Sequence, residues 1–158
     1  MVRINYREAF PEGMRAMHEF SKTVHRSGLE DSLIQLVLTR ASQINGCAWC
    51  LNMHTRDAMK AGEQPVRLHL LPAWRETPLY NERERAALAL TESMTLIAQT
   101  KAVPADIYDA AAAQFNEREL AALMLTIVEI NTWNRLAITA ENSPVLESVP
   151  QAVEGATR

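Results

Sequence analysis

The stretch Ala41-Ser42-Gln43-Ile44-Asn45-Gly46-Cys47-Ala48-Trp49-Cys50-Leu51-Asn52-Met53-His54 is the most informative part of the chain. Asn45-Gly46 lies between two helical patterns, so a new helix is expected to begin near Cys47. With ~100° of rotation per residue, Cys47, Cys50 and His54 fall within about 60° of one helix face. The spacing predicts two thiols and an imidazole that face the protein interior or a pocket.

The rest of the chain also has helical patterns, and strand patterns are nearly absent. Helices are predicted over residues 11–25, 30–44, 47–61, 64–71, 82–98, 104–115 and 117–139. Asn81 and Asn116 are each followed by Glu three residues later, which indicates an asparagine form of the capping box. We therefore expect one all-α domain over residues 1–142, a bundle of about six to seven helices, and a loose tail over residues 143–158.

The composition limits the function classes. The 158 residues are 47% hydrophobic and 22% charged, with a formal net charge of -3. A negative net charge disfavours binding to nucleic acid or to an anionic membrane, because binding to either needs a basic face. The N-terminus has no apolar signal core, and no apolar run approaches the ~18 residues that span a bilayer. A cytoplasmic protein is the expectation.

Three features favour reactive thiols. Free N–H groups at a helix start would stabilise a thiolate at Cys47. Cys50 and His54 are four residues apart, so the imidazole can accept the thiol proton or pair with a thiolate. Two cysteines three residues apart can also form a disulfide. The helix start favours Cys47 as the attacking thiol and the neighbouring His54 favours Cys50, so the order stays open.

The cysteine pair also allows other interpretations. Two cysteines on an apolar face can be inert core residues. Cys47, Cys50 and His54, with Asp57 or another histidine, could also ligate zinc, but the sequence holds no second Cys/His pair. Leu51 follows the second cysteine where c-type haem attachment needs histidine. The strands of a thioredoxin fold are missing. We therefore expect neither a metal nor a cofactor.

Several segments together resemble the alkylhydroperoxidase D-like (AhpD-like) branch of the carboxymuconolactone decarboxylase superfamily. The resemblance covers roughly residues 10 to 140. It is carried by Arg40-Ala41-Ser42-Gln43-Ile44-Asn45-Gly46-Cys47-Ala48-Trp49-Cys50, His54, Asp57-Ala58, Ala61-Gly62-Glu63, Glu84-Arg85-Ala86-Ala87-Leu88, Glu92 and Ile130-Asn131-Thr132-Trp133-Asn134-Arg135-Leu136.

The resemblance implies an AhpD-like helical bundle that forms dimers, trimers or hexamers. It implies a peroxidase that reduces hydroperoxides with Cys47 and Cys50, which become a disulfide, while His54 serves as the base. A separate thiol reductant would restore the dithiol. A non-catalytic redox sensor is the alternative from another class, and a decarboxylase-type enzyme of the superfamily ranks below it.

One position departs from the family pattern. AhpD-like members often carry Glu twelve residues before the first cysteine, where this chain has Gln35, and an amide cannot exchange a proton near neutral pH. Glu84 and Glu92 on the predicted 82–98 helix are candidates for the missing catalytic carboxylate. Each also has an ordinary interpretation, since Glu84 is the capping-box residue and Glu92 could pair with an arginine. Trp133 is expected to pack in the core.

Overall fold

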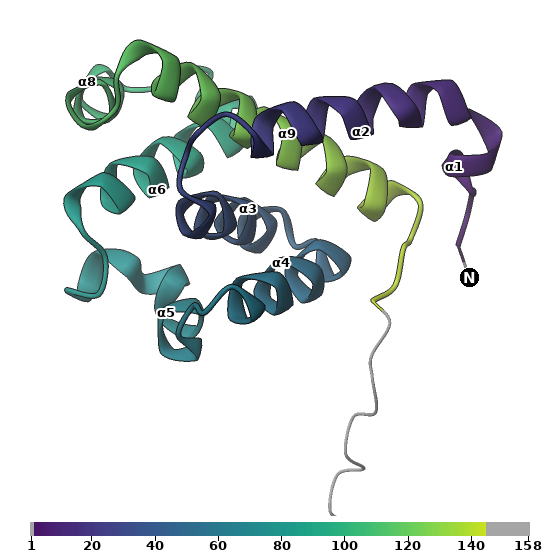
Figure 1. Ribbon diagram of the computed structural model, residues 1–158, viewed down its shortest axis with the longest axis horizontal. Coiled ribbons are helices and arrows are strands. Elements are labelled where there is room, and N and C mark those ends of the chain that lie inside the picture. The colour runs from purple at the N-terminus through teal and green to yellow at the C-terminus, as the bar shows by residue number, and fades with distance from the viewer. Residues whose placement is uncertain (1, 145–158) are drawn as a thin grey trace, which may run out of the picture.

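The computed structural model describes residues 2–144, and within them all regular structure is helical (Figure 1). The expected all-α class is confirmed. In chain order the helices are α1 (Tyr6–Ala9), α2 (Pro11–His25), α3 (Asp31–Asn45), α4 (Ala48–Lys60), α5 (Pro65–Leu70), the 3₁₀ helix η1 (Leu71–Glu76), α6 (Glu82–Thr95), α7 (Ile97–Thr100), α8 (Ala105–Gln114) and α9 (Glu117–Thr139).

The helix count in this part of the chain is higher than the six to seven expected. The four-residue helix α1 and the 3₁₀ helix η1 were not predicted as separate elements, because so few residues carry no readable periodicity. The predicted 82–98 helix is divided at Leu96, whose backbone (φ -91°, ψ 6°) leaves the helical region and separates α6 from α7.

Both asparagine capping boxes are confirmed. The Asn81 side chain accepts a hydrogen bond from the Glu84 backbone N–H, and the Glu84 carboxylate accepts one from the Asn81 N–H, each at 2.9 Å. Asn116 and Glu119 form the same pair of bonds at the start of α9. These bonds satisfy amide donors that would otherwise lack partners at the helix start, which explains why both starts were predicted correctly.

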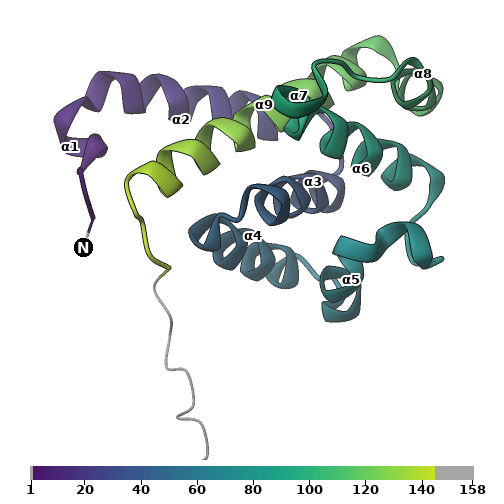
Figure 2. The same ribbon diagram turned by 180° about the vertical axis from the view of Figure 1, so that it is seen from behind.

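Helix α3 lies at the centre of the fold, against α4, α6 and α9, while α2 runs along α9 (Figures 1 and 2). Most of its apolar side chains are almost completely buried and belong to one of two hydrophobic clusters, with Ile34, Val37 and Leu38 in one and Leu36 in the other. Burying one such side chain contributes about 1.5–3 kcal/mol. The centre of the fold therefore holds the end of α3, and the cysteines that follow it, in a fixed place.

The turn between α3 and α4 depends on a glycine. Gly46 has φ 70° and ψ 31°, the left-handed conformation, and ends α3 directly before Cys47. An added Cβ would meet no atom within 4 Å, so a substitution costs backbone strain alone. We expect Gly46→Ala to lower the free energy of unfolding by about 1 kcal/mol, measured by urea denaturation. Gly46→Asn should lose less free energy of unfolding than Gly46→Ala, because asparagine tolerates the left-handed conformation better. Equal stability of Gly46→Ala and wild type would contradict a left-handed conformation at this position.

The segment before α2 contacts the C-terminal end of α9 and the residues directly after it. The Arg3 N–H donates to the Ala140 carbonyl at 2.9 Å, and the Asn142 amide donates to the Tyr6 hydroxyl at 2.9 Å. Residues 145–158 of the expected tail lie outside the described residues.

Between residues 2 and 144, no helix combines the length and the apolar character that a membrane crossing requires.

Candidate active site

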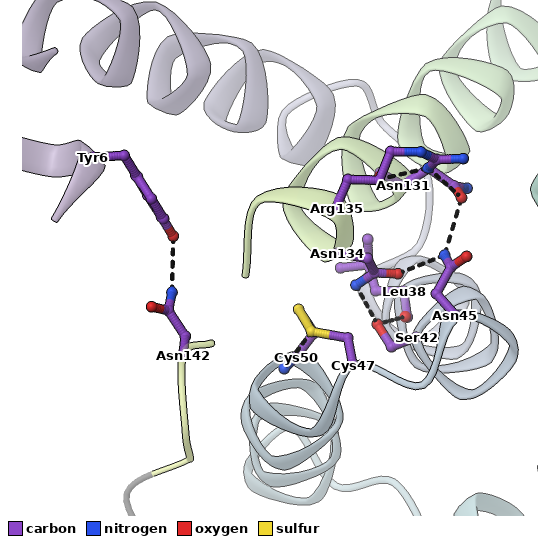
Figure 3. Close-up of a disulfide and its surroundings, with 10 residues drawn as sticks. All are labelled: Tyr6, Leu38, Ser42, Asn45, Cys47, Cys50, Asn131, Asn134, Arg135 and Asn142. Carbon is purple, nitrogen blue, oxygen red and sulfur yellow. Dashed lines mark hydrogen bonds between the residues drawn. A yellow bond between two sulfur atoms is a disulfide. The ribbon is translucent and has the colours of Figure 1, made fainter. Parts of the chain in front are cut away.

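Cys47 and Cys50 form a disulfide at the start of α4, with Cα atoms 5.4 Å apart (Figure 3). Cys47 is the N-cap rather than the first residue of the helix, and its sulfur accepts a hydrogen bond from the Cys50 N–H at 3.3 Å. This contact is the one expected between a helix start and a sulfur. Both side chains are buried, at 1% and 2% exposure.

His54 lies one helical turn after Cys50 and is 8% exposed. Its Nδ1 atom is buried and has no hydrogen-bond partner among residues 2–144. Burial lowers the pKa of His54 to about 4, an effect that Asp57 opposes and His25 strengthens. The imidazole is therefore neutral near pH 7 and can accept a proton.

Cys50 and His54 line one cavity of about 310 Å³, and Cys47 is not part of its wall. The cavity lies between helices that are distant in sequence. It is lined by Tyr6 and Arg7 of α1, His18, Ser21 and His25 of α2, Gln35 of α3, Trp49, Cys50, Met53, His54 and Asp57 of α4, and Glu129, Trp133 and Ala137 of α9. A small molecule in this space would meet Cys50 before Cys47.

The cavity wall also contains Glu129, which our sequence analysis missed. Its Oε1 accepts hydrogen bonds from the Ser21 hydroxyl at 2.5 Å and from the Trp133 indole N–H at 2.8 Å. Trp133, which we expected in the core, belongs to neither hydrophobic cluster and instead lines the cavity, with its ring 5.3 Å from that of His18. Glu129 could have been recognised in the sequence as a carboxylate on the predicted buried face of a helix, four residues before Trp133.

A network of amides fixes the end of α3 against α9 (Figure 3). The Asn45 amide donates to the side-chain oxygens of Asn134, at 2.8 Å, and Asn131, at 3.0 Å. The Asn134 amide in turn donates to the Ser42 hydroxyl at 3.0 Å. Since Asn45 is two residues from Cys47, the network positions the start of the disulfide-bearing helix.

Glu84 lies outside the cavity wall that holds Cys50 and His54. Besides its capping bond, its carboxylate forms an ion pair with Arg67 at 2.5 Å. The structure therefore gives Glu84 a helix-capping and ion-pairing role.

Glu92 is also absent from that wall. Its carboxylate accepts bonds from Arg40 at 2.8 Å, from the Trp74 indole at 2.9 Å and from Arg75 at 2.5 Å. Burial alone would raise the pKa of Glu92, but these hydrogen bonds outweigh it and lower the pKa. The side chain is thus held as an anion, which suits a link between helices better than proton donation.

In the part of the chain that the structure describes, no group of three or more His, Cys, Asp or Glu side chains converges in a way that could hold a metal ion.

The buried imidazole predicts a pH dependence of stability. Because the folded state holds His54 neutral down to about pH 4, the unfolded state binds more protons below about pH 6.5. The stabilisation is present above pH 6.5 and is lost as the pH falls towards 4. We expect the free energy of unfolding of the oxidised protein to fall by about 3 kcal/mol more in wild type than in His54→Gln over this range.

Urea denaturation between pH 4 and 7 measures this difference. Met59→Gln, an exposed position on the same helix with the same new side chain, is the matched control and should follow the wild-type curve. Parallel curves for wild type and His54→Gln would contradict a buried neutral imidazole.

Comparison with known proteins identifies the family. Residues 11–93 match the carboxymuconolactone decarboxylase family. The uncharacterized protein YdfG of Bacillus subtilis (strain 168) is 41% identical over 140 residues, which cover 89% of this chain and 95% of that protein.

Solved structures agree with this match. A protein of unknown function from Agrobacterium tumefaciens, described as a candidate antioxidant defence protein AhpD, is 38% identical with a TM-score of 0.89, covering 93% of this chain and 100% of the other. An uncharacterized peroxidase-related protein from Silicibacter sp. TM1040 has a TM-score of 0.76 at 21% identity, covering 86% and 72%, and shows the shared fold alone. The chain therefore belongs to the carboxymuconolactone decarboxylase family and is AhpD-like.

Proposed function

We propose that this protein is a peroxidase that reduces small organic hydroperoxides with the dithiol of Cys47 and Cys50. The observation that carries the proposal is the shared cavity: Cys50 and His54 both line it, and Cys47 is bonded to Cys50 behind its wall. An oxidised Cys50 would thus have its resolving thiol in place. Membership of the AhpD-like family supports a peroxidase-related activity.

In the first step the Cys50 thiolate attacks the outer oxygen of the hydroperoxide. The O–O bond breaks, the leaving oxygen takes a proton and departs as an alcohol, and Cys50 becomes a sulfenic acid. The neutral imidazole of His54, one helical turn after Cys50, would accept the proton that Cys50 gives up.

In the second step Cys47 attacks the sulfur of the sulfenic acid. The S–S bond forms, the S–O bond breaks, and the hydroxyl leaves as water with the thiol proton of Cys47. Each cycle therefore moves two electrons from the dithiol to one hydroperoxide.

An external thiol would restore the dithiol. Its thiolate would attack Cys50, which is the cysteine that reaches the cavity, and Cys47 would leave. A second thiol would then break the mixed disulfide and release the Cys50 thiol, so two thiols of the reductant become one disulfide. The N–H of Cys50, at 3.3 Å from the Cys47 sulfur, would stabilise the departing thiolate. The geometry thus favours Cys50 as the attacking thiol and Cys47 as the resolving thiol.

The cavity lining supports an organic substrate. Its volume of about 310 Å³ lies near the lower end of small-molecule sites. Aromatic and aliphatic side chains contribute a large part of the wall, among them Trp49, Met53 and Ala137. Cumene hydroperoxide is therefore a suitable test substrate, since it is small, neutral and mostly apolar.

Turnover separates a peroxidase from a redox sensor. Gln35, which lies in the cavity wall and cannot exchange a proton, is the observation that favours a sensor. With dithiothreitol as electron donor, a peroxidase consumes many equivalents of cumene hydroperoxide per protein. Consumption that stops after one equivalent would favour the sensor, and consumption that survives Cys50→Ser would contradict both.

A further inference from the structure

Glu129 is the most deeply buried acidic residue between residues 2 and 144, at 4% exposure. The two groups that donate to its carboxylate, the Ser21 hydroxyl and the Trp133 indole, are neutral. Among the described ion pairs none involves Glu129, whereas Glu92 is paired with Arg40 and Arg75. Glu129 is thus a buried carboxyl group held by neutral donors alone.

Packing does not explain a carboxyl group at this position. Burying a carboxylate without a cation costs several kcal/mol, even with hydrogen bonds in place. A glutamine of nearly the same shape could accept the same two bonds from Ser21 and Trp133 without that cost. What glutamic acid offers beyond glutamine is the ability to bind and release a proton.

Glu129 lies where a group that binds and releases a proton can take part in the reaction. Glu129 comes from α9 and lines the same cavity as Cys50 and His54 of α4. The other ionisable side chains of the wall are Tyr6 and Arg7 of α1, His18 and His25 of α2, and Asp57 of α4. Gln35, the position where related proteins often carry glutamate, also lines the cavity but has no proton to exchange.

We propose that Glu129 is the proton donor to the leaving oxygen of the hydroperoxide, an assignment that rests on the proposed peroxidase function. Cys50 attacks the outer oxygen, the O–O bond breaks, and the alkoxide takes the proton of Glu129 to become an alcohol. The proton released by the Cys50 thiol, passed on by His54, returns Glu129 to its protonated form. Protons and electrons therefore balance within the site.

The two residues then divide the proton transfer between them. His54 is held neutral by burial, so it can accept the proton of the Cys50 thiol and pass it to Glu129, while Glu129 delivers a proton to the leaving oxygen. Glu129 lies on a different helix and lines the same cavity as Cys50, so the proposal places the outer oxygen of the hydroperoxide at Cys50 and the inner one at Glu129. A protein acid in this position would contribute about 10²-fold to the rate.

The test compares two reactions of the same reduced thiol in Glu129→Gln and wild type. Reaction with cumene hydroperoxide releases an alkoxide that needs a proton, whereas alkylation by iodoacetamide releases iodide, which needs none. We expect the peroxide rate constant at pH 7 to fall about 100-fold, and alkylation to stay within about threefold of wild type. Glu129→Asp, which keeps the acid, should recover at least about 10-fold of the loss.

Stability measurements guard against a merely structural effect. Because glutamine can accept the same two bonds from Ser21 and Trp133, the thermal midpoint of Glu129→Gln should lie close to that of wild type. Glu117→Gln, at an exposed position of the same helix, is the matched control and should react with the hydroperoxide as wild type does.

Each remaining outcome has a definite meaning. If wild type reacts with the hydroperoxide much faster than a free thiol and Glu129→Gln reacts equally fast, the assignment of Glu129 is overturned and the peroxidase function stands. A parallel loss of both reactions also overturns it, because it shows a positioning or folding effect. A wild type no faster than a free thiol overturns the peroxidase function, and the assignment with it.

Discussion

Replacing Cys50 by serine is expected to slow the reaction of the reduced protein with cumene hydroperoxide by at least about 10³-fold. The thiolate is the nucleophile, and a serine hydroxyl at the same position is not ionised near neutral pH. Cys50 is also the cysteine that reaches the cavity, so the buried Cys47 cannot replace it there.

Cys47→Ser provides the matched comparison on the same turn. It should keep the first step within about 10-fold of wild type and then accumulate a sulfenic acid on Cys50, since no resolving thiol remains. Trapping with dimedone and mass spectrometry, after rapid mixing, measures both quantities. If Cys47→Ser loses the first step and Cys50→Ser keeps it, the order of the two thiols is the reverse of our proposal.

Replacing Asn134 by alanine is expected to lower the free energy of unfolding by about 3–4 kcal/mol. Asn134 is 0% exposed, and its side chain accepts from Asn45 and donates to Ser42. The variant leaves the buried Ser42 hydroxyl and the half-buried Asn45 amide without this partner and creates a cavity between α3 and α9. Each of these changes costs about 1–3 kcal/mol.

Asn142→Ala is the control for this prediction. Its single side-chain bond to Tyr6 lies at the half-buried edge of the structure, where water can replace the lost partner, so we expect a loss below about 1 kcal/mol. Urea denaturation at pH 7 compares the two variants. Similar losses would show that the amide network at the end of α3 does not hold the fold together.

Helix boundaries were predictable where one residue determines them locally. Pro11 at the start of α2 and Asn116 at the start of α9 lie where the sequence analysis placed them, because Pro is suited to a first turn and Asn to an N-cap. The break at Leu96 was not predictable, since no proline or glycine marks it and the apolar pattern runs through it.

The site was predictable only where its residues share one helix. The spacing placed Cys47, Cys50 and His54 together, and they do lie on the first turns of α4 or directly before it. The placement of Glu92 depends on Arg40, which is 52 positions away and on another helix. The role of Glu129 depends on α2 packing along α9, a contact between segments that local patterns do not report.

The rate at which hydroperoxide oxidises the fully reduced protein tests the central claim most directly. After mixing with cumene hydroperoxide at pH 7, quenching by alkylation and mass spectrometry should show one intramolecular bond between Cys47 and Cys50. We expect it to form at least about 100-fold faster than a free small thiol reacts under the same conditions. If both cysteines are oxidised no faster than a free thiol, so that the quench still alkylates both of them, the account is contradicted.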